Sequence, residues 1–329
     1  MSLLAPTLQA FFTDRLIGQK RASTHTIAAY RDTIRLLLTF ASEQTATAPS
    51  DLDINDLPAP LIGAFLDHLE HERGNTIRTR NARLAAIRSL FKYAALRHPE
   101  HAATIQRVLA IPTKRHDQAL VTFLTDPELQ ALLDAPDQTT WIGRRDHTMI
   151  LLAAQTGLRA SELIGLTCAD LRLGTGAHVN CVGKGRKQRI TPLTNQTVTI
   201  MRAWTRERDG QPDDPLFATS TGHPLTRDAL EHRLAKHAAN AAASCPSLAT
   251  KTITPHVLRH TAAMRLLHAG VDTTVIALWL GHEQIQTTHI YLHADLAIKE
   301  KALARTTPPT AKPGRYQPTD RVLAFLDAL

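Results

Sequence analysis

The chain has 329 residues, a size for which two domains with separate cores are expected. Its 38 lysines and arginines exceed its 30 acidic residues by 8, and with 43% hydrophobic residues this favours a soluble globular protein that binds a polyanion. Three scattered cysteines, and the lack of any apolar run near the roughly 20 residues of a membrane span, exclude a disulfide framework, a zinc site and a transmembrane helix, so we expect a cytoplasmic protein with no membrane partner.

Residues 6 to about 111 have the pattern of helices, without a convincing strand. The segment THTIAAYRDTIRLLLTFASEQ places Ile27, Ile34 and Leu37 on one helical face. A second helical run, PAPLIGAFLDHLEHERG, ends at Gly74, a typical residue at the end of a helix. The first domain is therefore predicted to be a small helical bundle.

A third helix in this region has one apolar and one basic face. It begins at Asn75 or Thr76, and its apolar stripe consists of Leu84, Ile87, Leu90, Phe91 and Ala94. The turn of about 100° per residue places Arg78, Arg88 and Lys92 opposite that stripe. This face is either a solvated surface or a surface laid against DNA.

A linker follows, in which the helical pattern is lost. It contains Lys114 and Arg115, two further candidates for DNA contact, and a new helix begins at TDPE, where Thr125 and Glu128 have the capping-box spacing. We therefore predict a helical domain over 1–112, a linker over 113–122 and a second domain over 123–305.

The second domain is predicted to be mostly helical, with one exception. The segment AHVNCVGKGRKQRITPL alternates apolar and polar residues, breaks at two glycines and resumes, which predicts a β-hairpin with Lys184 in its turn. The fold class is therefore mainly α with a small β-sheet. The chain closes with a proline-rich tether and a short apolar helix over 306–329.

Two basic motifs follow each other in the second domain. In TGLRASEL, Arg159 lies in a tight turn between helices, where it either points into a cleft or forms a structural ion pair with Glu162. In GKGRKQR, the glycines let Lys184 approach a ligand, and Arg186 and Lys187 add phosphate-binding charge. The spacing of an ATP-binding loop is absent.

Two further motifs contain histidines. PHVLRH places His256 and Arg259 one turn apart at a helix N-terminus, a suitable anion site, while we interpret His260 as a packing residue. In LGHEQIQTTHIYLH, His282 follows a helix end and Tyr291 lies among polar residues, which predicts an exposed hydroxyl.

The six candidate catalytic residues are Arg159, Lys184, His256, Arg259, His282 and Tyr291. The motifs offer no carboxylate pair, no metal-ligand cluster and no serine or cysteine beside a base. They do contain a tyrosine, which can attack a phosphodiester to form a phosphotyrosine, and arginines, which can hold the charge of the transition state. We therefore expect phosphoryl transfer without a metal or another cofactor.

In their order and amino-acid sequence, these motifs resemble those of the tyrosine recombinases, or phage integrase family, over roughly residues 7–305. The resemblance implies a helical core-binding domain and a catalytic domain that clamp double-stranded DNA like a C. It implies that Tyr291 is the nucleophile, that Arg159, Arg259 and His282 contact the phosphate, that Lys184 protonates the leaving 5′-oxygen, and that His256 takes the tyrosine proton.

The resemblance also implies a homo-oligomer, a synaptic tetramer on DNA. The apolar segment Val322 to Leu329 is too hydrophobic to stay bare, so it docks either on its own domain or on a neighbouring subunit, and we favour exchange between subunits. The 38 residues after Tyr291 favour a mobile-element integrase over a compact chromosome resolvase. Two alternatives stay open, a type IB topoisomerase that rejoins the same strand and a catalytically silent DNA-binding protein.

Overall fold

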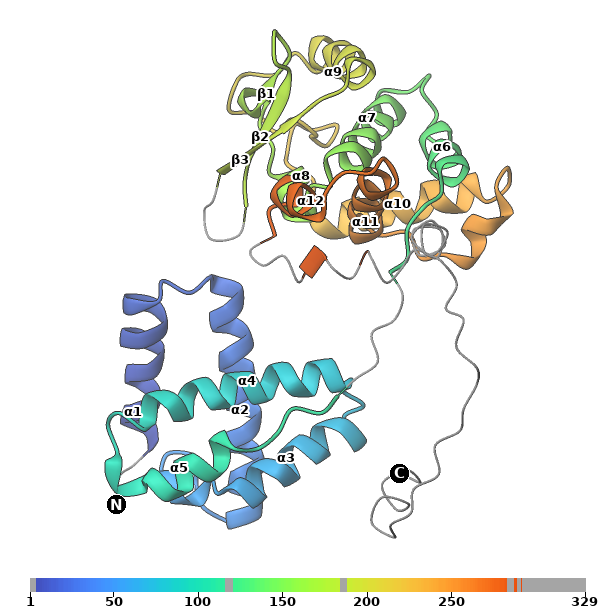
Figure 1. Ribbon diagram of the computed structural model, residues 1–329. Coiled ribbons are helices and arrows are strands. Elements are labelled where there is room, and N and C mark those ends of the chain that lie inside the picture. Colours follow the sequence, from blue (N-terminus) through green and yellow to red (C-terminus); the bar gives the residue numbers. More distant parts are fainter. Residues whose placement is uncertain (1–3, 116–120, 184–187, 283–286, 289–290, 292–329) are drawn as a thin grey trace, which may run out of the picture. The chain divides into compact units, whose positions relative to one another are not determined.

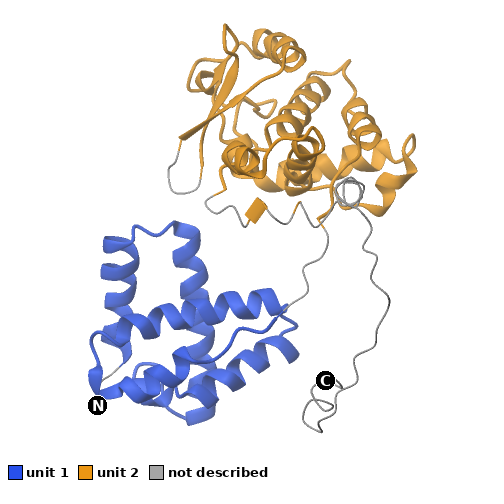
Figure 2. Cartoon of the chain, in the orientation of Figure 1, with its two compact units in different colours: residues 1–118 blue, residues 119–329 orange. Residues whose placement is uncertain are grey.

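The computed structural model describes residues 4–115, 121–183, 188–282, 287, 288 and 291, and the chain divides into two compact units, 1–118 and 119–329 (Figure 1, Figure 2). The described part is mostly helical with one three-strand sheet, which confirms the predicted fold class. The division between the units falls inside the predicted linker. None of the described helices is long and apolar enough to cross a membrane.

Unit 1 is built from helices joined by short turns. Its elements are α1 (Leu4–Ala10), the π-helix η1 (Phe11–Gln19), α2 (Thr24–Thr45), η2 (Ile54–Asp56), α3 (Ala59–His71), α4 (Ile77–Ala94), η3 (Pro99–His101) and α5 (Ala102–Leu109). Thr76 begins α4, where its side chain accepts a hydrogen bond from the Thr79 backbone. All five residues of the predicted apolar stripe of α4 are buried, so the stripe is the core face of this helix.

The predicted basic face of unit 1 is less open than the sequence indicates. Arg78 and Lys92 are exposed, and so is Arg115. Arg88 is half-buried because its guanidinium donates to the Ile111 carbonyl, and Lys114 is held by the Glu70 carboxylate at 2.8 Å. Two of the five cations are therefore engaged within their own unit, which the helical period could not show.

Unit 2 contains the sheet and a larger set of helices. Its elements are α6 (Asp126–Asp134), α7 (Trp141–Thr156), α8 (Ala160–Ile164), η4 (Cys168–Asp170), β1 (Leu171–Arg172), β2 (His178–Val182), β3 (Gln188–Pro192), α9 (Asn195–Arg208), α10 (Arg227–Ala241), η6 (Pro246–Thr250), α11 (Pro255–His268) and α12 (Thr273–Leu280). The predicted capping box begins α6, with Thr125 and Glu128 bonding each other's backbone N–H groups.

The predicted β-hairpin is present as β2 and β3, which pair antiparallel from His178–Pro192 to Val182–Gln188. The short strand β1 adds to the free edge of β2, a strand that the sequence pattern did not predict because it has only two residues. The predicted catalytic residue Lys184 and the predicted DNA contacts Arg186 and Lys187 lie outside the described residues.

A buried ionic network ties α7 to α10 inside unit 2. One carboxylate oxygen of Asp146 accepts from Arg145, and the other accepts from Arg233 at 3.1 Å and lies 2.8 Å from His237 Nε2. Asp146 and Arg145 are fully buried, so each charge depends on its partner. The network thereby fixes α7, whose last turn leads directly into the TGLRASEL motif.

Candidate active site

The turn between α7 and α8 positions Arg159. Gly157 ends α7 in the left-handed conformation, with φ at 64°, and a Cβ atom there would lie 2.5 Å from Leu280 Cδ2. Arg159, two residues later, begins α8, and its guanidinium donates to the Gly281 carbonyl at 3.0 Å. The glycine therefore allows α12 to approach the turn closely, and the arginine bridges the two.

Arg259 is held from both sides by main-chain carbonyls. It projects from α11, is only 2% exposed, and donates to the Gly157 carbonyl at 2.6 Å and the Leu280 carbonyl at 2.7 Å. Burial, together with the Arg159 charge, lowers the pKa of Arg259 from 12.5 to about 10. Arg259 therefore remains a cation at neutral pH.

The carboxyl end of α12 thus accepts from two guanidinium groups, Arg159 and Arg259. The last carbonyls of a helix have no partner inside it and carry the negative end of its dipole. The partial negative charge of these carbonyls offsets only part of the two cationic charges, so positive charge gathers at the end of α12. Such a concentration of charge suits a phosphate group.

Glu162 links Arg159 to the β-hairpin. Its buried carboxylate accepts from the Arg159 guanidinium at 2.8 Å and from Arg189 on β3 at 2.7 and 2.9 Å. Burial alone would raise the pKa of this carboxyl, but the hydrogen bonds from Arg189 and from the Arg159 backbone outweigh it and lower the pKa from 4.5 to about 2. Arg159 therefore forms the predicted ion pair with Glu162, and its side chain is still 32% exposed.

The Glu162 carboxylate should make unfolding depend on acid. A depressed pKa contributes stability that is present above pH 4.5 and lost as pH falls toward 2, on the order of 3 kcal/mol in the free energy of unfolding. In urea titrations at pH 7 and pH 3.5, we expect the stability gap between wild type and Glu162→Gln to shrink at the lower pH. The control is Glu231→Gln, which breaks an exposed pair with Arg227. A gap that stays constant across this range would contradict the role given to Glu162.

Tyr291 lies beside this cationic cluster, but it is buried. Only 1% of it is exposed, and its ring packs among Ala263, Met264, Leu267, Ile276 and Leu280. The predicted exposed hydroxyl is therefore wrong, because α11 and α12 supply an apolar wall that the polar neighbours in the sequence did not reveal. Burial raises the pKa of Tyr291 to about 12, although the charges of Arg259 and Arg159 act in the opposite direction.

Two histidines lie against the tyrosine. The His282 ring stacks on Tyr291 at a centroid distance of 6.3 Å, and its Nδ1 lies 2.7 Å from the Thr288 hydroxyl. His260 Nδ1 lies 3.1 Å from the Tyr291 hydroxyl. Burial, followed by the charge of Arg259, lowers the pKa of His282 to about 4, so its imidazole is neutral at neutral pH.

His256 and Arg259, which the sequence places together, lie in different surroundings. Arg259 is buried whereas His256 is exposed, and the His256 ring packs on that of His260 at a centroid distance of 4.2 Å. Sequence reasoning assigned His260 to packing alone and did not predict that Arg189 pairs with Glu162. Both contacts join residues about 30 positions apart, so no local pattern could have indicated them.

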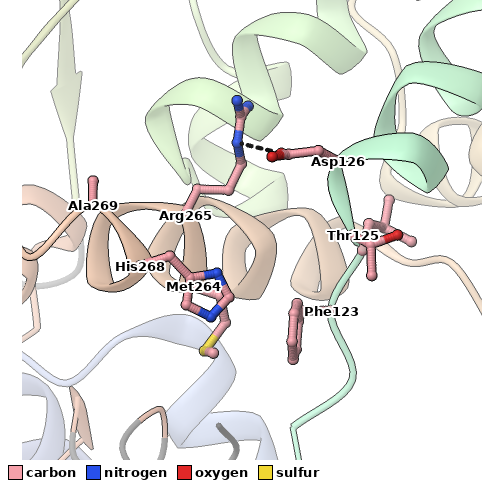
Figure 3. A pocket seen from close by; sticks show the side chains of 8 residues that line it. Phe123, Thr125, Asp126, Met264, Arg265, His268 and Ala269 are labelled. Atoms are coloured by element: carbon pink, nitrogen blue, oxygen red, sulfur yellow. Dashed lines mark ion pairs between the residues drawn. The ribbon is translucent and has the colours of Figure 1, made fainter. Parts of the chain in front are cut away.

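The structure therefore brings five of the six predicted catalytic residues into one region of unit 2, where α7, α11 and α12 meet. Lys184, the sixth, lies outside the described residues. A pocket of about 440 Å³ lies elsewhere, between the start of α6 and the second half of α11 (Figure 3). Its described lining includes the ion pair of Arg265 with Asp126 and none of the five, although it shares Met264 with the apolar surroundings of Tyr291.

The described residues thus combine a helical unit, a mixed unit and a tyrosine beside clustered arginines. The phage integrase family model matches residues 122–297, and the N-terminal SAM-like domain of phage integrases matches residues 10–98. The chain therefore belongs to the phage integrase family, the tyrosine recombinases, whose members catalyse site-specific recombination.

Individual relatives agree with this assignment. A Sinorhizobium fredii protein named as an integrase/recombinase, y4rC, is 53% identical over 99% of this chain and 98% of its own length. Tyrosine recombinase XerD of Pseudomonas putida is 31% identical over 90% of this chain and 96% of its own. Nothing in these likenesses favours a topoisomerase or a silent DNA-binding protein.

Two solved structures share the fold. XerH site-specific recombinase, in a post-cleavage complex with its palindromic difH substrate, superposes with a TM-score of 0.70 at 23% identity, covering 87% of this chain and 81% of its own. A chain from the structure of a lambda integrase tetramer bound to a Holliday junction superposes with a TM-score of 0.63 at 16% identity. The match covers 88% of this chain and 77% of that one. At these identities the likeness concerns the fold.

Proposed function

We propose that this chain cuts and rejoins DNA at specific sites through a covalent 3′-phosphotyrosyl link at Tyr291. The single observation that carries the proposal is the convergence of Arg159 and Arg259 on the end of α12, beside the buried Tyr291. A neutral phenol and two cations are the parts needed for transfer of a phosphodiester to an oxygen nucleophile.

In the proposed step Tyr291 first loses its proton, and the family resemblance implies that His256 accepts it. The phenolate oxygen forms a bond to phosphorus, and the bond from phosphorus to the 5′-oxygen breaks. The leaving oxygen takes a proton from Lys184 and becomes a free hydroxyl. Because the phosphotyrosyl link conserves the energy of the broken phosphodiester bond, the 5′-hydroxyl of another strand can reverse the step without ATP.

The two arginines are proposed to stabilise the transition state. A guanidinium has five N–H donors, and the hydrogen bonds described for Arg259 use two of its three nitrogens. These bonds fix the plane of the group before DNA arrives, so little reorganisation accompanies the reaction. His282 is neutral and lies beside Tyr291, where it can donate a hydrogen bond to a phosphate oxygen.

Trapping on nicked DNA tests the proposal. Protein is mixed with genomic fragments, covalently marked fragments are sequenced, and duplexes that carry the recovered site are then nicked so that cleavage is irreversible. We expect an adduct linked through Tyr291 to a 3′-phosphate, with the same yield in EDTA because the proposed groups are cations, imidazoles and a phenol. A 5′ link, a different residue or a need for Mg²⁺ would refute this chemistry.

Relaxation of supercoiled plasmid separates recombination from the topoisomerase alternative. A recombinase exchanges strands between two copies of its site, whereas a topoisomerase rejoins the same strand and relaxes plasmids that lack the site. We expect recombinant products only when two sites are present. Efficient relaxation of a plasmid without any site would instead favour the topoisomerase.

We further propose that Arg78, Lys92 and Arg115 of unit 1 and the 184–187 segment contact DNA phosphates, and that the active form is a synaptic tetramer. The exposure of the first three supports this, as does the charge of Arg186 and Lys187. The tetramer is supported by the shared fold with the lambda integrase tetramer. Closure of the two units around DNA as a C-shaped clamp stays a prediction.

The apolar tail is proposed to hold neighbouring subunits together. Residues 306–329 lie outside the described residues, so this rests on the apolar pattern from Val322 to Leu329. Protein truncated after Arg305 should bind DNA and form some adduct. Sedimentation of its complex with DNA should show fewer than four subunits. If the truncated protein recombines at the wild-type rate, the tail is not needed for strand exchange. If its melting temperature is lowered, the tail docks on its own domain.

A further inference from the structure

His260 is the residue that contacts the reacting oxygen of Tyr291. It follows Arg259 on α11, is 9% exposed, and its Nδ1 lies 3.1 Å from the tyrosine hydroxyl. The two rings meet edge to face, with centroids 5.5 Å apart and planes at 68°. On its other side His260 packs against the ring of His256, so it stands between the buried tyrosine and an exposed histidine.

We propose that His260 is the positioning residue of the nucleophile: its Nδ1 accepts the hydrogen bond of the Tyr291 hydroxyl and fixes the oxygen beside Arg159 and Arg259. This rests on the proposed function, in which Tyr291 attacks the phosphate. It differs from the sequence-based role of His256, because it concerns where the oxygen lies and not where its proton finally goes.

The protonation state of His260 determines which partner donates. The charged and titratable groups that act on it are His256, Arg259 and His282, and after burial, which has the largest effect, all three lower the pKa of His260 to about 4. The ring is therefore neutral at neutral pH and has one nitrogen free to accept. Of the two neutral tautomers, the inferred contact requires the one with its proton on Nε2, in which the tyrosine hydroxyl donates to Nδ1.

The directions of the two pKa shifts make His260 a poor final base for the Tyr291 proton. The pKa of Tyr291 is about 12 and that of His260 about 4. Burial raises the one and lowers the other, so complete transfer of the proton between them in this state is unfavourable. The contact instead gives a buried hydroxyl its partner, which an apolar wall of Met264, Leu267 and Leu280 cannot do.

Two amide substitutions at position 260 test whether a polar atom must lie where Nδ1 lies, or whether any polar side chain is enough. Asparagine at 260 places an amide atom at the same number of bonds from Cα as Nδ1, whereas glutamine places it further out, near Nε2. In single-turnover cleavage of the nicked duplex, we expect His260→Asn to react within about threefold of wild type and His260→Gln to be slower by about tenfold or more, the scale for leaving one buried hydroxyl without a partner. Both variants should bind the duplex with wild-type Kd and melt at similar temperatures.

A second measurement tests the contact without relying on cleavage. Long-range ¹H–¹⁵N spectra distinguish ring nitrogens, and the His260 signal is identified among the 17 histidines by its loss in His260→Asn. We expect Nδ1 of His260 to be unprotonated in wild type and to change its ¹⁵N shift in Tyr291→Phe, while the signals of exposed histidines stay constant. A protonated Nδ1, or an unchanged shift, would overturn the contact.

The outcomes separate this inference from the function beneath it. If wild-type protein forms no adduct at Tyr291, the proposed function fails, and the spectra still test the contact. If wild type forms the adduct and His260→Asn and His260→Gln react at equal rates, the positioning role fails and the function stands. If the glutamine variant does not fold, the comparison of wild type with Tyr291→Phe in the spectra decides the contact.

Discussion

A Tyr291→Phe protein is expected to bind its DNA site and to form no covalent adduct. The substitution removes one oxygen, the proposed nucleophile, and keeps a ring that is 1% exposed within the core of unit 2. Its effect on the free energy of unfolding should stay near 1 kcal/mol, the scale for one hydrogen bond, here the bond to His260. Gel mobility under denaturing conditions measures the adduct, and Kd under native conditions measures binding.

Tyr93→Phe is the matched control for loss of a buried hydroxyl. Tyr93 is 7% exposed, belongs to α4 of unit 1 and is not among the proposed catalytic residues. We expect this variant to form the adduct at the wild-type rate. An adduct trapped with Tyr291→Phe would show that another residue attacks, and loss of the adduct in both variants would show that the assay reports damage to the fold.

Arg259→Lys is expected to reduce single-turnover cleavage by about 10² or more, the scale for removing one preorganised donor group. Lysine keeps a positive charge but has a single nitrogen, and it cannot span from the Gly157 carbonyl to the Leu280 carbonyl as the guanidinium does. Because those bonds also join α7 to α12, a loss of melting temperature should accompany the loss of rate. DNA affinity should fall much less than the rate.

Arg208→Lys controls for replacing a largely buried arginine that bonds the backbone. Arg208 ends α9, its side chain is 13% exposed, and it donates to the Pro215 carbonyl at 3.3 Å. We expect a modest stability loss and near-normal cleavage. Cleavage by Arg259→Lys close to wild type would remove Arg259 from the transition state and leave it a structural role only.

Local sequence signals predicted the elements that local interactions build. The Thr125 capping box and the two strands around Lys184 each depend on residues within a few positions of one another. The apolar stripe of α4 was equally readable, because a helix buries residues at its own period. The π-helix η1 was not predicted, since its hydrogen bonds skip one residue more than the usual period and leave no simple pattern.

The site was predicted as a set of residues but not as an arrangement. Motif order indicated Arg159, Arg259 and Tyr291, yet nothing near Tyr291 in the sequence reveals that α11 and α12 bury it. The contacts of His260 with Tyr291 and of Arg189 with Glu162 span 31 and 27 positions. Such pairs are created by the packing of whole helices and strands, so they become visible only in three dimensions.

The acceptors that hold Arg159 and Arg259 on α12 and α7 include the main-chain carbonyls of Gly157, Leu280 and Gly281. A codon change exchanges a side chain and leaves the carbonyl in place, so mutation cannot delete these acceptors as it could delete a carboxylate. The vulnerable codon is that of Gly157, where φ is 64° and an added Cβ would lie 2.5 Å from Leu280 Cδ2. Alanine at position 157 would have to adopt a left-handed backbone conformation and displace the Leu280 side chain, so the codon of a residue that bonds neither arginine through its side chain is the sensitive one.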